Sequence, residues 1–468
     1  MNTFAATLNN IATTTRTENG DKAYSTTSNY CLDLFFQVGA LRGQKEERIR
    51  DLFAAAFVED RDLATRIALW TRDIRDGAGE RMIFRYILKY IENNDIDLLL
   101  NILHLVPVVG RWDDLFVVMN NDRSARAVLE MYQQALENKD ALAAKWAPRE
   151  NADPLFAARL RNFLRLTPKQ YRKLISGLTK VVEQQMCANE WGEINYPHVP
   201  SVASARYSKA FGRHDKDRYS AYIDEVKKGK KKINTAAVYP YDVLKGSVDD
   251  KTADAMWKNL PNYVGNANIL PMVDVSGSMT FNRITNGLTP LDVSLSLGLY
   301  LADRNTGPFK DLCVMFSRIP SLFKIPGGDI RAKARALRAA PWKGQSTNLD
   351  AAMTLVLDIA VDNRIPQDDL PKALIVLSDM EFDKSPEGVN SSVSERTKTA
   401  FNNAGYTMPM IVWWNIQSRN GSSPIRGNEH NMALVSGFSP AIVKSVLAGD
   451  LNPVDIMLRA VNKEKYSW

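Results

Sequence analysis

The spacing of apolar residues changes near residue 265, and this change most limits how the chain can fold. Before it, apolar side chains recur every three or four residues, which is typical of helices with one buried face. In QKEERIRDLFAAAFVED the apolar residues on one helical face are Ile49, Leu52, Phe53, Ala56 and Phe57. After it, short β-branched runs alternate with amphipathic stretches. A chain of 468 residues with two such patterns predicts two domains.

The first pattern predicts an α-helical domain over residues 31–264. Successive amphipathic segments suggest paired helices in a HEAT-like array, although no repeat of constant length is present. Residues 1–30 are rich in Thr, Asn and Ser, so we expect a flexible arm, or one laid over another element. The helices expected after the first one cover residues 63–74, 83–91, 111–119, 122–139 and 168–187.

The second pattern predicts a doubly wound α/β domain over residues 265–468. Its expected strands are NILPMVDV, LCVMFS, KALIVLSD and MPMIVWWN, and amphipathic helices separate them. Short apolar strands that alternate with helices are typical of a parallel sheet covered on both faces. Ligands of such sheets bind beyond the carboxyl ends of the strands.

Composition narrows the protein class. No window of eighteen apolar residues and no secretory signal pattern is present, so we expect a cytoplasmic protein without a membrane partner. Cys31, Cys187 and Cys313 lie far apart without CxxC spacing, which argues against a disulfide framework or a zinc site and favours packing roles.

The string MVDVSGSM at residues 272–279 ends the first expected strand and allows three kinds of chemistry. A serine nucleophile would need a base, yet none of the four histidines lies in a recognisable triad context. A phosphate loop would need more glycines and a lysine. We therefore expect no enzyme. A metal site fits better, because a carboxylate and two hydroxyls on alternate residues offer hard oxygen ligands.

Further oxygen ligands are available at other strand ends. Thr347 precedes an expected helix, and Asp379 ends the very apolar strand LIVLSD. With Asp274, Ser276 and Ser278, they resemble the metal-ion-dependent adhesion site of von Willebrand factor A domains. The resemblance implies that these five residues hold Mg²⁺, or another divalent cation such as Mn²⁺ or Ca²⁺, and leave one position for an acidic group of a partner. A purely structural loop is the alternative, and Glu381 and Asp383 are expected on the solvated surface.

A basic stretch precedes the change of pattern. Residues 206–232 contain ten Lys or Arg and four Asp or Glu, with Tyr207, Phe211, Tyr219 and Tyr222 interleaved. Cations neutralise phosphates and aromatic rings stack on unpaired bases, so RNA binding is one interpretation. A solvated helix followed by an exposed linker is the other. The candidate RNA-binding residues are Arg206, Lys209, Arg213, Lys216, Arg218, Lys227, Lys228, Lys230, Lys231 and Lys232.

The whole arrangement, helical repeats before an A domain with an intact metal motif, resembles the Ro autoantigen, or TROVE, family of RNA-binding proteins. The strings RDGAGERMIFR, GRWDDLF, KWAPRE and ALVSGFSP are more similar to a poorly characterised relative found in plants, fungi and viruses. The Ro resemblance implies a ribonucleoprotein that binds small structured RNA or RNA ends. The alternative is an adaptor whose metal clamps an acidic residue of a protein partner.

Overall fold

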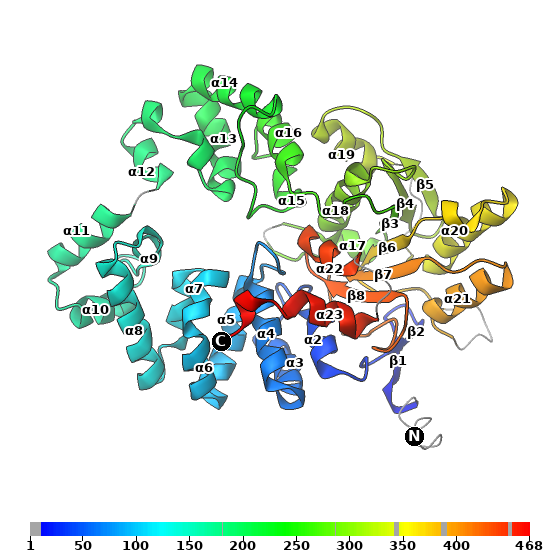
Figure 1. Cartoon of the computed structure of the whole chain (residues 1–468), viewed down its shortest axis with the longest axis horizontal. Coiled ribbons are helices and arrows are strands. Elements are labelled where there is room, and N and C mark those ends of the chain that lie inside the picture. Colours follow the sequence, from blue (N-terminus) through cyan, green and yellow to red (C-terminus); the bar gives the residue numbers. More distant parts are fainter. Residues whose placement is uncertain (1–10, 180, 286, 341–345, 385–390, 448–451) are drawn as a thin grey trace.

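A computed structural model describes residues 11–179, 181–285, 287–340, 346–384, 391–447 and 452–468. It contains a helical array followed by a domain built on a six-stranded sheet (Figure 1). The predicted fold class is therefore confirmed. The array ends with α16 at Asn259 and the sheet begins with β3 at Ile269.

The array consists of short helices, several of which have a side-chain cap at their first turn. Asp60 caps α4 through the Leu63 amide, and Thr167 forms a capping box with Gln170 at the start of α11. Its α-helices are α2 (Tyr30–Val38), α3 (Glu46–Glu59), α4 (Arg61–Arg72), α5 (Arg81–Asn94), α6 (Ile96–Ile102), α7 (Val106–Val109), α8 (Asp122–Glu137), α9 (Ala141–Trp146), α10 (Pro154–Phe163), α11 (Pro168–Leu178), α12 (Val182–Cys187), α13 (Ser201–His214), α14 (Lys216–Lys227), α15 (Pro240–Val243) and α16 (Asp250–Asn259).

Two expected helices differ from the structure. Residues 111–119 were expected to be α-helical, but 112–118 form the 3₁₀ helix η2, whose capping box ties Asp114 to the Arg111 amide. The helix expected over 168–187 is two helices, α11 and α12, because α11 ends at Leu178 with Thr179 in an extended conformation. The remaining 3₁₀ turns of the array are η1 (Leu103–Leu105), η3 (Trp191–Glu193) and η4 (Tyr196–His198).

The sheet has the strand order β5-β4-β3-β6-β7-β8. All strands of this sheet other than β5 are parallel, whereas β5 pairs antiparallel with β4 at one edge. The expectation of a parallel sheet thus needs one correction, and the sequence did not indicate β5 or β8. The strands are β3 (Ile269–Asp274), β4 (Leu312–Phe316), β5 (Ser321–Lys324), β6 (Ala373–Ser378), β7 (Met410–Asn415) and β8 (Met432–Ser436).

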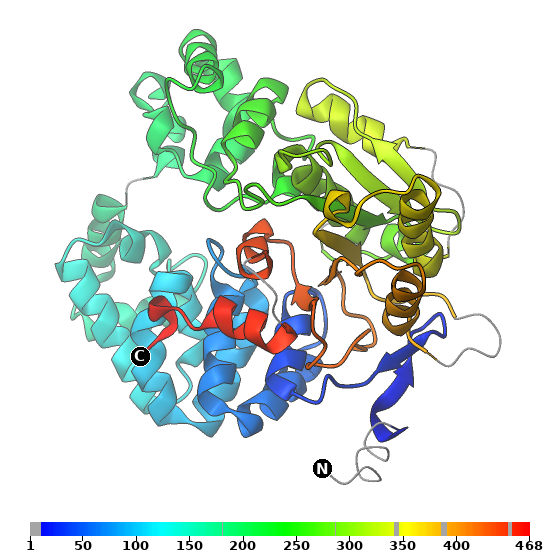
Figure 2. The ribbon, with the colours of Figure 1, turned by 45° about the vertical axis from the view of Figure 1, so that its right-hand side comes forward.

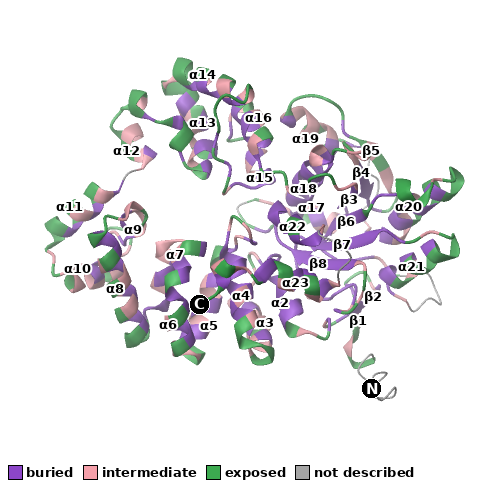
Figure 3. Ribbon diagram, in the orientation of Figure 1, coloured by how far each residue is buried: buried purple, intermediate pink, exposed green. Residues whose placement is uncertain are grey.

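Helices cover both faces of this sheet, as a doubly wound fold requires (Figure 1). Every residue of β3, β6, β7 and β8 is buried, which explains their continuous apolar sequences (Figure 3). The helices of this domain are α17 (Gly277–Phe281), α18 (Pro290–Arg304), α19 (Ile330–Arg338), α20 (Leu349–Asp362), α21 (Val393–Asn403), α22 (Val443–Val446) and α23 (Pro453–Val461), with 3₁₀ turns η5 (Gln367–Asp369), η6 (Pro440–Ile442) and η7 (Glu464–Tyr466).

The helical array contacts the sheet domain at both of its ends. At its start, α2 packs on β8 and α4 packs on α23. At its finish, α15 packs on α18 and α16 packs on α19. The array therefore follows an arc that leaves the sheet domain and returns to it, as the two views show (Figures 1 and 2). The chain closes into a ring.

The described part of the N-terminal arm lies on the sheet domain. Its strands β1 (Thr14–Arg16) and β2 (Lys22–Tyr24) form a hairpin, and the Tyr24 amide donates to the Ser423 carbonyl at 2.9 Å. Residues 1–30 were expected to be either flexible or laid over another element. Residues 11–30 take the second arrangement, because they lie on the sheet domain. None of the helices in the described ranges is long and apolar enough to cross a membrane.

Candidate metal centre and basic surface

The five predicted metal ligands belong to neighbouring strand ends. Asp274 is the last residue of β3, and Asp379 directly follows β6, the strand that pairs with β3 in parallel. Ser276 and Ser278 lie at the start of α17, and Thr347 lies just before α20. Because the carboxyl ends of parallel strands meet at one edge, all five residues gather at the same side of the sheet.

Asp274 is fully buried and held by hydroxyl and amide groups. Its Oδ1 accepts from the Ser276 amide at 2.9 Å, and its Oδ2 accepts from the Ser378 hydroxyl at 2.5 Å. The Ser276 and Ser278 hydroxyls lie 3.2 Å apart. Two hydroxyls and one carboxylate of the DVSGS loop thus converge, as the spacing of the motif predicts.

Asp379 is also buried, and one of its oxygens has no hydrogen bond. Its Oδ1 accepts from the Glu381 amide at 3.3 Å, whereas no hydrogen-bond donor among the described residues reaches its Oδ2. The Arg419 guanidinium lies 3.7 Å from this oxygen, too far for a hydrogen bond. Thr347, 1% exposed, is tied to the same loop because its carbonyl accepts from the Asp383 amide at 3.1 Å.

The electrostatics of this edge favour a bound cation. Burial, and then the nearby Asp379 carboxylate, raise the pKa of Asp274 to about 7. Burial likewise raises the pKa of Asp379, although the nearby Ser278 hydroxyl opposes the effect. A divalent cation would offset the repulsion and satisfy the free Asp379 oxygen. The described residues contain no cluster of three His, Cys, Asp or Glu placed to hold a metal, so a cation at this edge would depend on the hydroxyls.

Sequence reasoning missed several neighbours of this site. Glu381 was expected on the surface, but it is 1% exposed, and its carboxylate accepts from the Glu18 amide at 2.5 Å. That expectation was wrong because the N-terminal arm covers the loop. Arg419 pairs with Glu18 and approaches Asp379, and no local signal in the sequence marks it. Ser378 could have been noticed, because it directly precedes Asp379 in the apolar strand.

The aromatic rings of the basic stretch face inward. Phe211, Tyr219 and Tyr222 are at most 5% exposed, and Tyr207 is half-buried. The rings of Phe211, Tyr219 and Tyr222 pack around Tyr196 at centroid distances of 5.3, 4.9 and 5.5 Å, respectively. The suggestion that these rings stack on RNA bases is therefore wrong, because they form the core between α13 and α14.

The ten candidate RNA-binding cations separate into two groups. Four of them have partners within the protein: Lys209 donates to the Gly246 carbonyl, Arg218 pairs with Asp215, Lys227 with Asp254 and Lys231 with Glu225. The other six are exposed, and no carboxylate within the described ranges lies within 4 Å of them. They are Arg206, Arg213, Lys216, Lys228, Lys230 and Lys232.

A different aromatic pair lies beside these cations. The Trp191 and His214 rings stack with centroids 4.4 Å apart and planes 10° from parallel. His214 is exposed between Arg213 and the exposed Lys216. No local pattern in the sequence indicates this pair, because its members are separated by more than twenty residues and meet only when α13 packs against η3.

The fold and the strand-edge site first define the class of protein: a closed helical array joined to an α/β domain whose parallel strands gather oxygen-bearing side chains at one edge. Comparisons then give relatives of the chain. Two family models match it, Domain of unknown function DUF2828 over residues 17–120 and 149–262, and Domain of unknown function DUF7788 over 268–465.

One relative is viral. The "Uncharacterized protein L728" of Acanthamoeba polyphaga mimivirus is 29% identical over 507 residues, which cover 95% of this chain and 86% of that protein. Among solved structures, the chain is similar to the Ro (RSR) protein of Deinococcus radiodurans. That likeness has 15% identity and a TM-score of 0.49, and it covers 92% of this chain and 98% of the other.

Proposed function

We propose that this chain is a cytoplasmic, non-enzymatic RNA-binding protein of the Ro type, which binds small structured RNA or RNA ends through its helical domain. The observation that carries the proposal is the group of six exposed cations on α13, α14 and the turn after α14, with no carboxylate of the described residues within 4 Å of them. We call these six residues the basic surface. The architecture adds support, because a closed helical array with an A domain is what the Ro resemblance implies.

The basic surface suits RNA with unpaired nucleotides. Its cations would neutralise phosphates and release bound counter-ions, which makes affinity depend on salt. The exposed His214 ring stacks on Trp191 and offers a flat surface for an unpaired base. Loops and ends of a structured RNA present such bases, whereas a continuous duplex does not.

Charge reversal tests this assignment. The test uses a triple variant in which Glu replaces Lys228, Lys230 and Lys232. Binding of a stem-loop RNA is measured by fluorescence anisotropy at several salt concentrations. Each lost phosphate contact lowers the slope of log affinity against log salt by about 0.7–0.9. We therefore expect weaker binding and a slope smaller by about 2–3.

The matched control reverses three exposed lysines of the sheet domain, Lys324, Lys372 and Lys398, which changes the net charge equally. Equal losses in the two triple variants would mean that overall charge, rather than the basic surface, attracts RNA. Unchanged affinity and slope in the first variant would rule out the assignment.

We propose further that the strand-edge site holds Mg²⁺ or a similar divalent cation. Asp274, Ser276, Ser278, Thr347 and Asp379 would be its ligands, directly or through water. The Oδ2 atom of buried Asp379 supports this proposal: it accepts no hydrogen bond from the described residues, and a buried carboxylate oxygen without one is costly. When bound, the cation supplies positive charge to two buried carboxylates and a position for an acidic group.

Thermal unfolding with and without MgCl₂ tests the site. A ligand at one hundred times its dissociation constant stabilises the folded state by about 2.7 kcal/mol, so the wild type should melt a few degrees higher. Ser278→Ala should remove most of this shift, whereas Asp383→Asn, outside the ligand set, should keep it. If Mg²⁺, Mn²⁺ and Ca²⁺ all leave the wild-type melting temperature unchanged, the proposed site is wrong.

The adaptor alternative predicts a different result for captured partners. In a pull-down with wild type and Asp274→Ala, recovery that nuclease abolishes supports RNA as the bound partner. Protein partners that survive nuclease and disappear only with Asp274→Ala would support a metal clamp on an acidic residue instead.

A further inference from the structure

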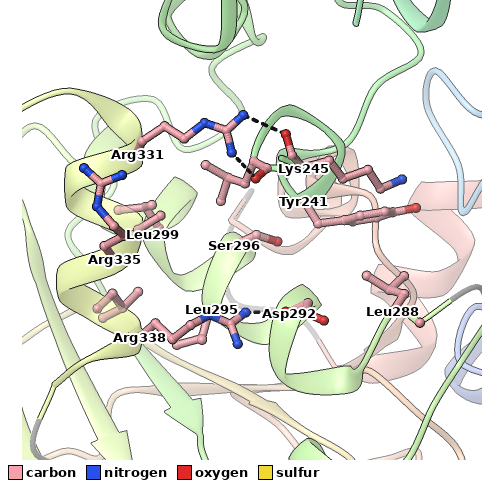
Figure 4. Close-up of a pocket in the computed structure, with 14 residues that line it drawn as sticks. Tyr241, Lys245, Leu288, Asp292, Leu295, Ser296, Leu299, Arg331, Arg335 and Arg338 are labelled. Atoms are coloured by element: carbon pink, nitrogen blue, oxygen red, sulfur yellow. Dashed lines mark hydrogen bonds and ion pairs between the residues drawn. The ribbon is translucent and has the colours of Figure 1, made fainter. Parts of the chain in front are cut away.

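A groove of about 510 Å³ lies where the end of the helical array meets the sheet domain. Its walls come from α15 and the turn after it, from α18 with the loop before it, and from α19 (Figure 4). This groove is separate from the strand-edge residues and from the basic surface, since it contains none of their side chains.

The floor of the groove is aliphatic. Leu295 and Leu299 of α18 are buried, while Leu244 and Leu288, which also line the groove, are half-buried. Ala334 of α19 also lines the groove, and its small side chain fills little of the space. An aliphatic side chain that covers the apolar atoms still open to water in the groove would be favoured by the hydrophobic effect.

The rim of the groove is basic. Within the described ranges its lining includes four cations, Lys245, Arg331, Arg335 and Arg338, and one carboxylate, Asp292. The Arg331 guanidinium is not available to a ligand, because it donates to the Leu244, Lys245 and Val248 carbonyls. Arg338 pairs with Asp292, as Figure 4 shows.

Arg335 differs from these neighbours. Its side chain is exposed at the groove, and no carboxylate of the described chain lies within 4 Å of it. The basic residues around it on α19 all have partners: Arg331 pairs with Asp250, Lys333 with Asp303 and Arg338 with Asp292. Arg335 therefore offers positive charge to a ligand beside an aliphatic floor.

The aromatic geometry argues against a nucleic acid in this groove. Tyr241 is the one aromatic residue among the described residues of the lining, and it is 9% exposed. Its ring stacks on Tyr239 at 5.7 Å, meets Phe438 edge-on at 6.0 Å, and has the Lys245 ammonium 5.0 Å from its centroid. These neighbours crowd the ring and it is itself buried, so it is poorly placed to stack on a base, whereas leucines and an arginine suit a peptide.

We propose that this groove binds a segment of a partner protein that carries acidic residues next to aliphatic ones. Carboxylates of the segment pair with Arg335 at the rim, and leucine or isoleucine side chains cover the floor. The groove is thus a docking surface for protein, distinct from the RNA-binding surface, and it functions whether or not the strand edge holds a metal.

Fluorescence anisotropy with synthetic peptides tests this proposal. The probe is a labelled peptide that alternates pairs of Glu and Leu, and the comparison peptides replace Glu by Gln or Leu by Ser. We expect the Glu/Leu peptide to bind most tightly. Arg335→Glu should weaken it at least tenfold, and Ala334→Trp should abolish binding because the indole fills the groove. Lys398→Glu, on the exposed face of α21, should leave the affinity unchanged.

Circular dichroism melts of each variant establish that the fold is retained, and the matched single charge reversals keep net charge equal. The proposal is overturned if the Glu/Leu peptide does not bind the wild type, or if it binds Arg335→Glu and Ala334→Trp as tightly. It is also overturned if a labelled oligouridine displaces the peptide and itself loses affinity in Ala334→Trp, because the groove would then be a nucleic-acid site. Failure of the RNA assignment leaves this test unaffected.

Discussion

Asp114 shows how a single buried carboxylate organises the helical array. It is fully buried, and it accepts from the Nε atoms of Arg72 and Arg85 at 2.7 Å each and from the Arg111 amide at 3.0 Å. The two arginines come from α4 and α5, so the carboxylate joins three elements.

Replacing Asp114 should therefore be costly. In Asp114→Asn the Arg72 side chain, only 6% exposed, would lose its counter-ion. Removing one partner of a buried ion pair costs about 3–5 kcal/mol, and we expect this loss in the free energy of unfolding measured with urea. Asp97→Asn, which breaks the exposed pair with Arg123, should cost less than about 1 kcal/mol. Similar losses in both variants would contradict this explanation.

At the scale of elements, the joint between α2 and β8 depends on very close backbone contact. The Gly39 amide at the end of α2 donates to the Ser436 hydroxyl at 3.0 Å, and that hydroxyl donates to the Phe35 carbonyl. A Cβ atom on Gly39 would lie 2.6 Å from the Ser436 carbonyl oxygen. Here glycine is required by the approach of two backbones rather than by its φ angle, which is −70°.

Gly39→Ala should consequently destabilise the protein. Overpacking of this kind costs about 1–3 kcal/mol, to be measured as a shift of the urea midpoint. Gly177→Ala is the control, because Gly177 lies in helix α11 and an added methyl group there would meet no described atom within 4 Å. Alanine there should be neutral or stabilising by up to about 1 kcal/mol. Equal effects at both positions would show that close contact at Gly39 is unimportant.

At the scale of the whole molecule, ring closure rests on polar contacts between residues far apart in sequence. At one junction, Arg331 of α19 donates to three carbonyls that follow α15 and pairs with Asp250 of α16. At the other, Lys465 pairs with Asp73 and Asp76, and the Tyr466 hydroxyl donates to Asp73 at 2.9 Å. The two junctions hold the array against the sheet domain.

Arg331→Met should loosen the first junction and leave the second intact. Hydrogen bonds to a charged group contribute about 1.5–3 kcal/mol each, so amide exchange over residues 240–259 should accelerate by about tenfold or more. Exchange over residues 30–38 and 432–436 should stay unchanged in the same hydrogen-exchange experiment. Arg338→Met, in the same helix but bound to Asp292, is the control. Unaltered exchange in Arg331→Met would mean that other contacts close the ring.

Local patterns were enough to predict much of this protein. The change of apolar period near residue 265 predicted a helical array and an α/β domain, because the period depends only on nearby residues. The DVSGS loop, Thr347 and Asp379 could be assigned to one sheet edge, since parallel strands end on the same side. Even so, β5 and β8 were missed, and η2 was expected to be an α-helix.

Only the tertiary structure decided which of these side chains are free to act. Aromatic side chains of the basic stretch are buried and Trp191 stacks on His214, because the packing of α13 and α14 sets the orientation of these rings. Four of the ten cations in this stretch have partners within the protein, and Arg419 approaches Asp379 from a distant loop. Closure of the ring likewise depends on contacts between opposite ends of the array. Sequence spacing determines the elements, but exposure and long-range pairing arise only when those elements pack.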